Sequence, residues 1–150
     1  MTLAWHSARS DTLPRLLSHG YNLKREQFIF CTSAVHGNLI KKHYPGYRVA
    51  WGITIKEENG KIAFNPKEHA KFCKENNIDI YAIGHWIHKN LDLITPKYIR
   101  AIKKSGVKFA IWTENDPALI KKWIDMGVDM ICTDKGAEFV KELENIKKQK

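Results

Sequence analysis

Five short apolar runs recur along the chain, and a segment with helical signals follows each of them. The runs are almost continuously apolar rather than alternating, which is typical of strands covered on both faces of a parallel sheet. Their spacing suits repeated strand-helix units. The runs predicted as strands are Gln27–Cys31, Arg48–Ile53, Ile78–Ile83, Val107–Trp112 and Val128–Cys132.

Three helices are predicted from a capping residue placed before an early proline. Thr95-Pro96 begins one, Asn65-Pro66 a second, and Asn115 a third, in which Asp116-Pro117 forms the first turn. Gly127 is expected to end the third helix in a left-handed conformation. Shorter signals predict a helix at Thr12–Ser18, a turn at Asn59-Gly60 and a helix from Gly136 onward.

Alternation of strands and helices leaves two architectures open, a doubly wound open sheet or part of a barrel. A dinucleotide fold normally shows a Gly-x-Gly-x-x-Gly loop after its first strand, and a nucleotide hydrolase a Gly-Lys-[Ser/Thr] loop. Neither loop occurs in the chain, and Thr32–Gly37 carries a single glycine. Composition alone does not separate the two architectures.

The chain has 150 residues, of which 43% are hydrophobic, enough for one domain with a real core and too many for a disordered protein. No apolar stretch approaches the length of a membrane helix, and Met1–Ser10 lacks a signal-peptide pattern. Its 3 cysteines are widely spaced, which favours reduced, packed thiols in a cytoplasmic protein. We therefore expect a cytoplasmic domain spanning residues 1–150.

The net charge of +9 favours an anionic partner such as a phosphate compound, nucleic acid or a membrane surface. The lysine pairs Lys103-Lys104 and Lys121-Lys122 are expected on solvated outer faces of helices. Nucleic-acid recognition would need aromatic residues interleaved with basic ones, and the aromatic residues here belong mostly to the apolar runs. No nucleic-acid partner is predicted.

In both architectures functional groups lie at the carboxyl ends of parallel strands. Hydroxyls and helix N-termini at such ends can bind phosphate, whereas Ser33, Asn115 and Asp134 can equally cap helices. His85 and His88 are three residues apart, but no third ligand is clustered with them, so packing is favoured over a metal site. The polar residues at the strand ends are Thr32, Ser33, Thr54, His85, Trp112, Thr113, Thr133 and Asp134.

Two segments resemble the closing signature of the glycerophosphodiester phosphodiesterase family. Val107–Asp116 reads Val-Lys-Phe-Ala-Ile-Trp-Thr-Glu-Asn-Asp, and Met126–Asp134 reads Met-Gly-Val-Asp-Met-Ile-Cys-Thr-Asp. In the family, a strand ending in Trp-Thr-x-Asn-Asp precedes a helix and then Gly-Val-Asp-Gly-Ile-x-Thr-Asp. More diffusely, Phe28–Ala34 and the run Tyr44–Gly52 resemble the family's middle segment, so the resemblance extends over residues 12–140.

The chain also departs from the family pattern. Glu114 stands where the family has an apolar residue, Met130 replaces a glycine, Ala34 replaces a phenylalanine, and Lys135-Gly136 replaces x-Pro. The family's His-Arg-Gly, Glu-x-Asp, His-Asp and Glu-x-Lys motifs precede the region matched here. None of these motifs is found in Met1–Gln27.

The resemblance implies the C-terminal part of a TIM-type (β/α) barrel with about five strands. The family hydrolyses phosphoric diesters of glycerophospholipid metabolism, with two histidines as acid and base and a divalent cation, Ca or Mg, held by acidic residues. By this resemblance Trp112, Thr113 and Ser33 line the substrate cleft, although Trp112 could equally pack in the core near the barrel mouth. Asn115, Thr133 and Asp134 would contact phosphate or cap helices. No catalytic or metal residue is assigned.

Three functions remain in competition. The first is a partial phosphodiesterase domain, which needs complementation to act on a glycerophosphodiester-type small molecule. The second is a non-catalytic interaction module that completes a barrel with another copy of itself or with a separate N-terminal half-barrel. The third is a small doubly wound domain that binds another phosphate compound, and it would be recognised by a reversal in strand order.

Overall fold

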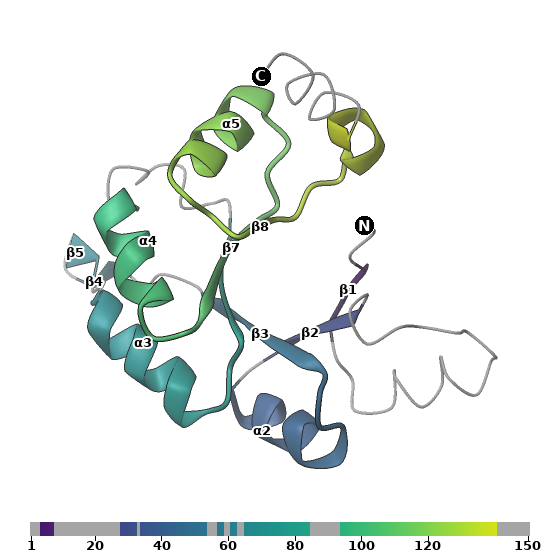
Figure 1. The fold of residues 1–150 in the computed structure, drawn as a ribbon, viewed down its shortest axis with the longest axis vertical. Helices are drawn as coiled ribbons and strands as arrows, with labels where there is room; N and C mark the ends of the chain where they lie inside the picture. The colour runs from purple at the N-terminus through teal and green to yellow at the C-terminus, as the bar shows by residue number, and fades with distance from the viewer. Residues whose placement is uncertain are drawn as a thin grey trace.

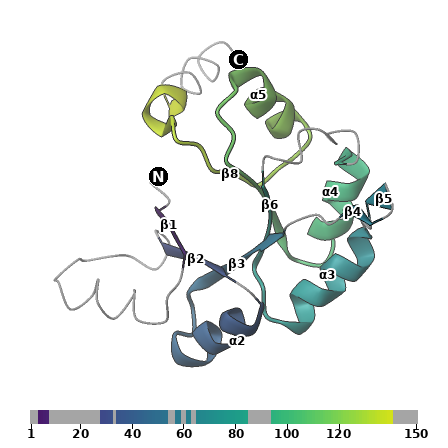
Figure 2. The same ribbon diagram turned by 180° about the vertical axis from the view of Figure 1, so that it is seen from behind.

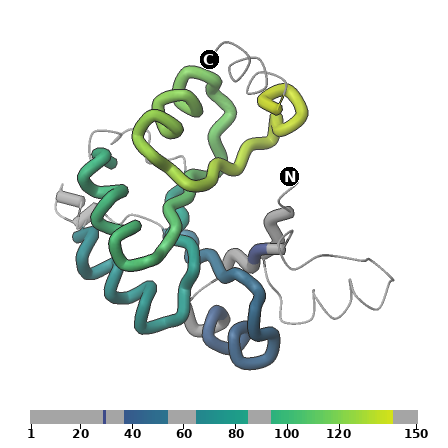
Figure 3. The backbone as a smooth tube through the Cα atoms, viewed as in Figure 1, coloured from purple at the N-terminus to yellow at the C-terminus, as the bar shows by residue number. Residues whose placement is uncertain are grey.

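The computed structural model describes residues 4–7, 28–32, 34–53, 57–58, 61–62, 65–84 and 94–140. Figure 3 shows in colour the parts whose side chains can be described, namely residues 29, 37–53, 65–84 and 94–140. The predicted helix Thr12–Ser18, the turn Asn59-Gly60, the segment His85–His88 and Ser33 lie outside the described residues.

Six parallel strands form the main sheet, in the order β1-β2-β3-β6-β7-β8 (Figure 1). This order follows the sequence without a reversal, as in a (β/α) barrel and unlike a doubly wound sheet. The third alternative above is therefore wrong about the architecture. The strands are β1 (Ala4–Ser7), β2 (Phe28–Thr32), β3 (Arg48–Ile53), β6 (Ile80–Gly84), β7 (Lys108–Trp112) and β8 (Met130–Ile131).

The five predicted strands are confirmed to within two residues at each end. The strand β1 was not predicted, because four residues, Ala-Trp-His-Ser, are too few to show a period. It pairs with β2 in register from Ala4 opposite Phe28 to Ser7 opposite Cys31. Two further short strands, β4 (Glu57–Glu58) and β5 (Lys61–Ile62), form an antiparallel pair that was not predicted.

Helices α2 (Ala34–His43), α3 (Pro66–Glu75), α4 (Pro96–Lys103) and α5 (Pro117–Asp125) alternate with the strands. Asn65 and Thr95 cap α3 and α4 as predicted, the first accepting from Lys67 N at 3.0 Å. The predicted cap of α5 is wrong, because Asp116 rather than Asn115 accepts from Ala118 N, at 2.8 Å. Residues 136–140 are helical, as predicted from Gly136 onward.

The helices lie along one face of the curved sheet, as Figures 1 and 2 show from opposite sides. Alternate strand residues such as Val49, Tyr81 and Phe109 face the helices, and together with helix residues such as Trp123 of α5 they form the larger apolar cluster. The intervening residues form a second, smaller cluster on the other face of the sheet. Its members are Ile29, Ala50, Ile80, Ala82 and Ala110, with Trp112 and Met130 packed against them.

The second face is built largely from small residues in neighbouring strands. Ala82 lies in register with Gly52 on one side and Ala110 on the other, and Ala110 in turn with Met130. Small side chains allow the sheet to curl toward this face, which corresponds to the filled interior of a barrel. Every alanine of this face is fully buried.

At the amino ends of the strands, an aspartate binds both a backbone amide of the neighbouring strand and a lysine side chain, and this arrangement occurs twice. Asp79, just before β6, accepts from Val49 N at 2.7 Å and pairs with Lys41 at 2.6 Å. Asp129, just before β8, accepts from Phe109 N at 2.8 Å and pairs with Lys103 at 2.8 Å. Lys103 thus binds a specific carboxylate, which differs from the solvated role expected for it.

Each of these two aspartates follows a helix that ends in a left-handed residue, Asn77 at φ 54° and Gly127 at φ 86°. The left-handed turn reverses the chain so that the aspartate can start the next strand. Gly127 is the predicted helix end, whereas Asn77 fills the same place with a residue that tolerates this conformation. No helix in the described part of the chain is long and apolar enough to cross a membrane.

Candidate functional site

The carboxyl ends of β7 and β8 lie side by side and carry most of the predicted site residues. Cys132 N donates to Ile111 O at 2.9 Å, and Glu114 N donates to Cys132 O at 2.8 Å. These bonds extend the pairing of β7 and β8 beyond the two residues of β8 itself. The segments Trp112–Asn115 and Cys132–Asp134 are therefore held together at the carboxyl end of the sheet. Barrel enzymes have their active sites at this end.

Trp112 lies at the last position of β7, on the face that corresponds to the barrel interior. Its indole is half-buried and packs against the cluster of small residues beneath it. Its register partner on β6 is Gly84, which has no side chain to compete for space above the cluster. The next residue, Thr113, is half-buried and follows a cis peptide bond. Both side chains belong to the carboxyl end of the sheet.

Asn115 joins the two strand ends through both atoms of its amide. Its Oδ1 accepts from the Thr133 hydroxyl at 2.9 Å and from Asp134 N at 2.9 Å. Its Nδ2 donates to Asp134 Oδ2 at 3.0 Å. The Thr133 hydroxyl also accepts from Lys135 N at 3.1 Å, which fixes the turn into the last helical segment. Asn115 therefore clamps the loops of the site and does not cap α5.

Glu114 is the one charged residue in the described part of the chain that is buried, with 3% of its surface exposed. Its Oε1 accepts from Asn115 N at 3.0 Å and Asp116 N at 3.1 Å, and its Oε2 accepts from Trp123 Nε1 at 3.1 Å. A carboxylate at the start of α5 is also favoured by the positive end of that helix. Glu114 thus anchors the site loop to the helix behind it.

Glu114 had appeared in the sequence only as a departure from the family pattern. The sequence did contain a signal for the anchoring role of Glu114. It is an acidic residue directly before the helix start Asn-Asp-Pro, and its carboxylate can reach the first free backbone amides of that helix. Trp123 could not be recognised as its partner from the sequence, because the two residues meet only when α5 packs on the sheet.

A site for the divalent cation of the family would need several acidic or imidazole ligands close together. Of the carboxylates that follow β7 and β8, Glu114 accepts from three N–H donors, Asp116 accepts from Ala118 N, and Asp134 accepts from Asn115 Nδ2. No group of three His, Cys, Asp or Glu residues suited to a metal ion occurs among the described residues. These residues do not fit a cation site, so we derive no step through a metal.

The remaining candidate residues contribute less. Ser33 and His85, which follow β2 and β6 in the sequence, lie outside the described residues. Cys132 is half-buried, and burial raises the pKa of its thiol, as does the charge of Asp134. Burial likewise raises the pKa of the Cys73 thiol to about 12. Both thiols are thus protonated at neutral pH, in keeping with the packing role predicted for Cys132.

Solved structures of phosphodiesterases share this fold. A glycerophosphodiester phosphodiesterase from Parabacteroides distasonis superposes with a TM-score of 0.61 at 20% identity, covering 89% of this chain and 49% of that one. One from Thermotoga maritima gives 0.58 at 17%, covering 89% and 54%. An Oleispira antarctica phosphodiesterase in complex with the product sn-glycerol-3-phosphate gives 0.63 at 12%, covering 88% and 48%.

The chain spans about half the length of these enzymes, and its fold is therefore part of a TIM-type barrel. Among curated proteins, no match was found. The sequence model of the glycerophosphoryl diester phosphodiesterase family matches residues 49–138, which is more than half of the chain. That range contains β6, β7 and β8, all of β3 except its first residue, and the contacts of Asn115 with Thr133 and Asp134. The chain belongs to the glycerophosphoryl diester phosphodiesterase family.

Proposed function

We propose that residues 1–150 form a single domain that is the C-terminal portion of a glycerophosphodiester phosphodiesterase barrel. Its role is to supply one wall of the cleft that receives a glycerophosphodiester. The observation that supports this most directly is the position of Trp112, at the carboxyl end of β7 and on the interior face of the sheet. Barrel enzymes bind their substrates at this end.

Each proposed cleft residue has a role suited to its chemistry. The indole of Trp112 offers an apolar surface to the carbon atoms of the glycerol moiety. The hydroxyl of Thr113 can donate to or accept from a substrate oxygen, and Ser33 would do the same from the end of β2. Asn115, Thr133 and Asp134 form hydrogen bonds with one another. We therefore assign them to holding Trp112 and Thr113 in place.

We further propose that the chain does not hydrolyse diesters unaided. Metal-assisted cleavage needs carboxylates to hold the cation and a general acid for the leaving alkoxide. In the family these groups come from motifs that precede the matched region, and none of those motifs is found in Met1–Gln27. The divalent cation would thus be held mainly by a complementing half-barrel, and the protein would act in the cytoplasm.

The activity of the purified chain tests this proposal. We expect no turnover of glycerophosphocholine with either Ca²⁺ or Mg²⁺, at enzyme concentrations where an intact family member is easily detected. Metal-dependent release of sn-glycerol 3-phosphate that survives repeated purification would contradict the proposal. A Trp112→Ala variant would then show whether the activity belongs to this chain, since contaminating enzyme would be unaffected.

Binding of sn-glycerol 3-phosphate tests the cleft separately from catalysis. We expect weak binding, detected by nuclear magnetic resonance titration, that Trp112→Ala reduces about tenfold, whereas Trp112→Phe retains most of it because the ring surface is kept. The control is Trp51→Phe, a tryptophan on the helix face of β3. Equal binding by wild type and Trp112→Ala would contradict the proposed role of Trp112.

A second candidate function is a non-catalytic interaction module. In the described sheet, β1 and β8 each have a strand on one side only, so both present an unpaired edge within this set of strands. Such edges favour pairing with another chain. A second copy or a separate N-terminal half-barrel would provide that pairing.

A further inference from the structure

We propose that a basic pocket at the amino ends of the strands binds a compact anion carrying two or more phosphate groups. The pocket has a volume of about 710 Å³ and lies between the ends of α2 and α3, the start of β3 and the turn from α4 into β7. Small-molecule sites span roughly 300–1,000 Å³. It is at the opposite end of the strands from Trp112, so it is independent of the proposed cleft.

The charge of the lining is strongly one-sided. Five cationic side chains, those of Lys41, Lys42, Arg48, Lys74 and Lys108, face a single carboxylate, that of Asp79. Five positive charges less one negative charge leave +4, out of a net charge of +9 for the whole chain. These residues come from two helices and two strands, so no single stretch of sequence shows them as a cluster.

Helix ends explain part of this charge but not all of it. The carboxyl end of a helix carries about half a negative charge, which lysines in the last turn offset. Helices α2, α3 and α4 end at the pocket, and each end contributes about half a negative charge. Together with the full negative charge of Asp79, these ends offset fewer than about three of the five positive charges. Arg48 and Lys108 begin strands and belong to no helix.

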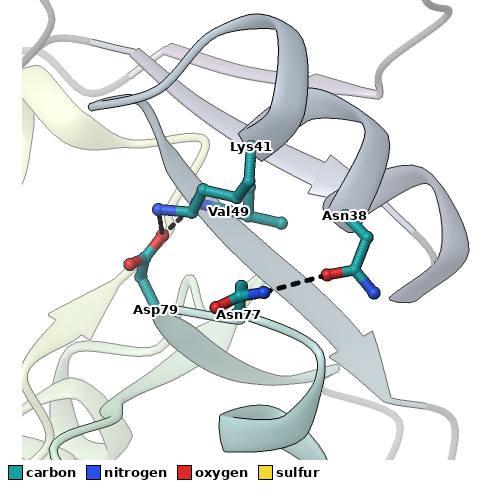
Figure 4. A network of polar contacts seen from close by, with 5 residues as sticks. All are labelled: Asn38, Lys41, Val49, Asn77 and Asp79. Carbon is teal, nitrogen blue, oxygen red and sulfur yellow. Dashed lines mark hydrogen bonds and ion pairs between the residues drawn. The ribbon is translucent and has the colours of Figure 1, made fainter.

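The only carboxylate of the pocket lining is already engaged (Figure 4). Asp79 pairs with Lys41 at 2.6 Å and accepts from Val49 N at 2.7 Å. Beside it, Asn77 Nδ2 donates to Asn38 Oδ1 at 3.2 Å, which ties α2 to the turn before β6. These contacts hold α2 against the turn before β6, and none of them involves Lys42, Lys74 or Lys108.

Three lysines are left to receive a ligand. Lys42, Lys74 and Lys108 are exposed, and none of the ion pairs found among the described residues involves them. A lysine ammonium is a compact charge with three rotatable donors, which suits phosphate oxygens approaching from several directions. Because the three lysines come from three separate elements, a ligand with at least two phosphate groups matches them better than orthophosphate does.

Calorimetric titration with inorganic pyrophosphate tests the site, with orthophosphate as the comparison ligand. We expect pyrophosphate to bind at least about tenfold more tightly than orthophosphate, and binding to weaken as salt is added. The double variant Lys42→Glu/Lys108→Glu should lose at least about tenfold in affinity. The matched control Lys67→Glu/Lys97→Glu has the same net charge but changes exposed lysines in the first turns of α3 and α4, away from the pocket lining.

The source of the phosphate groups is distinguished by flotation with vesicles of phosphatidylcholine, with and without phosphatidylinositol bisphosphate. Binding that requires the bisphosphate lipid and is lost in the pocket variant identifies a lipid headgroup as ligand, and pyrophosphate binding alone identifies a free anion. No binding of either, or equal losses in pocket and control variants, overturns the proposal. Circular dichroism checks folding, and Lys42→Gln/Lys108→Gln replaces the charge reversal if that variant unfolds.

Discussion

Glu114 connects three parts of the site with one side chain. Its carboxylate receives the backbone amides of Asn115 and Asp116 and the indole N–H of Trp123. Buried donors that lose their acceptor cost more than the bond itself contributed, because water cannot replace it. The residue that departs from the family pattern is thus expected to matter for stability as much as any residue that matches it.

Replacing Glu114 by glutamine should destabilise the domain by about 1–3 kcal/mol. The amide keeps one acceptor but turns a donor toward Trp123 Nε1 or toward the two backbone amides, which are donors themselves. The free energy of unfolding in urea is the measurement, with Glu138→Gln as control, since Glu138 is exposed. A loss equal to that of the control would show that the carboxylate charge is not needed.

Asp79 and Asp129 allow one interaction to be measured twice in the same molecule. Asp79 binds the amide of Val49 in β3 and a lysine of α2, the helix before β3. Asp129 binds the amide of Phe109 in β7 and a lysine of α4, the helix before β7. Asn at either position retains an acceptor but loses the charge, so we expect about 1–3 kcal/mol of destabilisation from each. Asp125→Asn, an exposed i,i+4 partner of Lys121, should cost under about 0.5 kcal/mol. If the destabilisation at Asp79 and that at Asp129 differed by more than twofold, the two aspartates would not be structurally equivalent.

At the scale of single elements, the helix starts and strands were largely predictable from the sequence. The capping signals at Asn65 and Thr95 are local, and the two side chains bind the amides that the pattern assigns to them. Asn115 and Asp116 compete for the same helix start, and local chemistry suits both. The side chain of Asn115 instead accepts hydrogen bonds from Thr133 and Asp134, which are distant in sequence, and so it does not cap the helix. Only tertiary structure could decide between them.

Helices α3 and α4 and strand β6 share a buried polar cluster that the sequence did not indicate. His69 Nδ1 lies 2.7 Å from the Tyr81 hydroxyl, which in turn bonds the Tyr98 hydroxyl. Desolvation by burial lowers the pKa of His69 from its ordinary value of 6.5, and the opposing effect of Glu68 is smaller. Burial also raises the pKa of both tyrosines, so they remain protonated.

The stability of this helix pair should therefore depend on pH. Because the pKa of His69 is lower in the folded state, the unfolded chain binds the extra proton first as the pH falls below 6.5. The free energy of unfolding should stay level above that pH and decrease from there down through the folded-state pKa. Urea unfolding between about pH 5 and pH 7.5 measures it. His69→Gln should remove this loss, whereas the exposed control His43→Gln should keep it.

On the scale of the whole molecule, the fold class followed from the sequence and the charge distribution did not. Continuously apolar runs, each followed by a helical segment, predict strand-helix repeats, and the resemblance carried by the Trp-Thr-x-Asn-Asp signature favours a barrel over a doubly wound sheet. The sequence does not indicate that Lys42, Lys74 and Lys108 line one pocket, because they lie on three separate elements. The pairing of Lys103 with Asp129 was missed for the same reason.

The two edges of the described sheet lead to a prediction about assembly. A complete (β/α) barrel closes with eight strands, whereas six parallel strands are described here, ending in β1 and β8. Backbone groups along such edges gain hydrogen bonds when another strand pairs with them. We expect the purified chain to self-associate, with a mass by size-exclusion chromatography and light scattering that rises with concentration. A monomer over the full accessible range would contradict this and leave a separate half-barrel as the remaining partner.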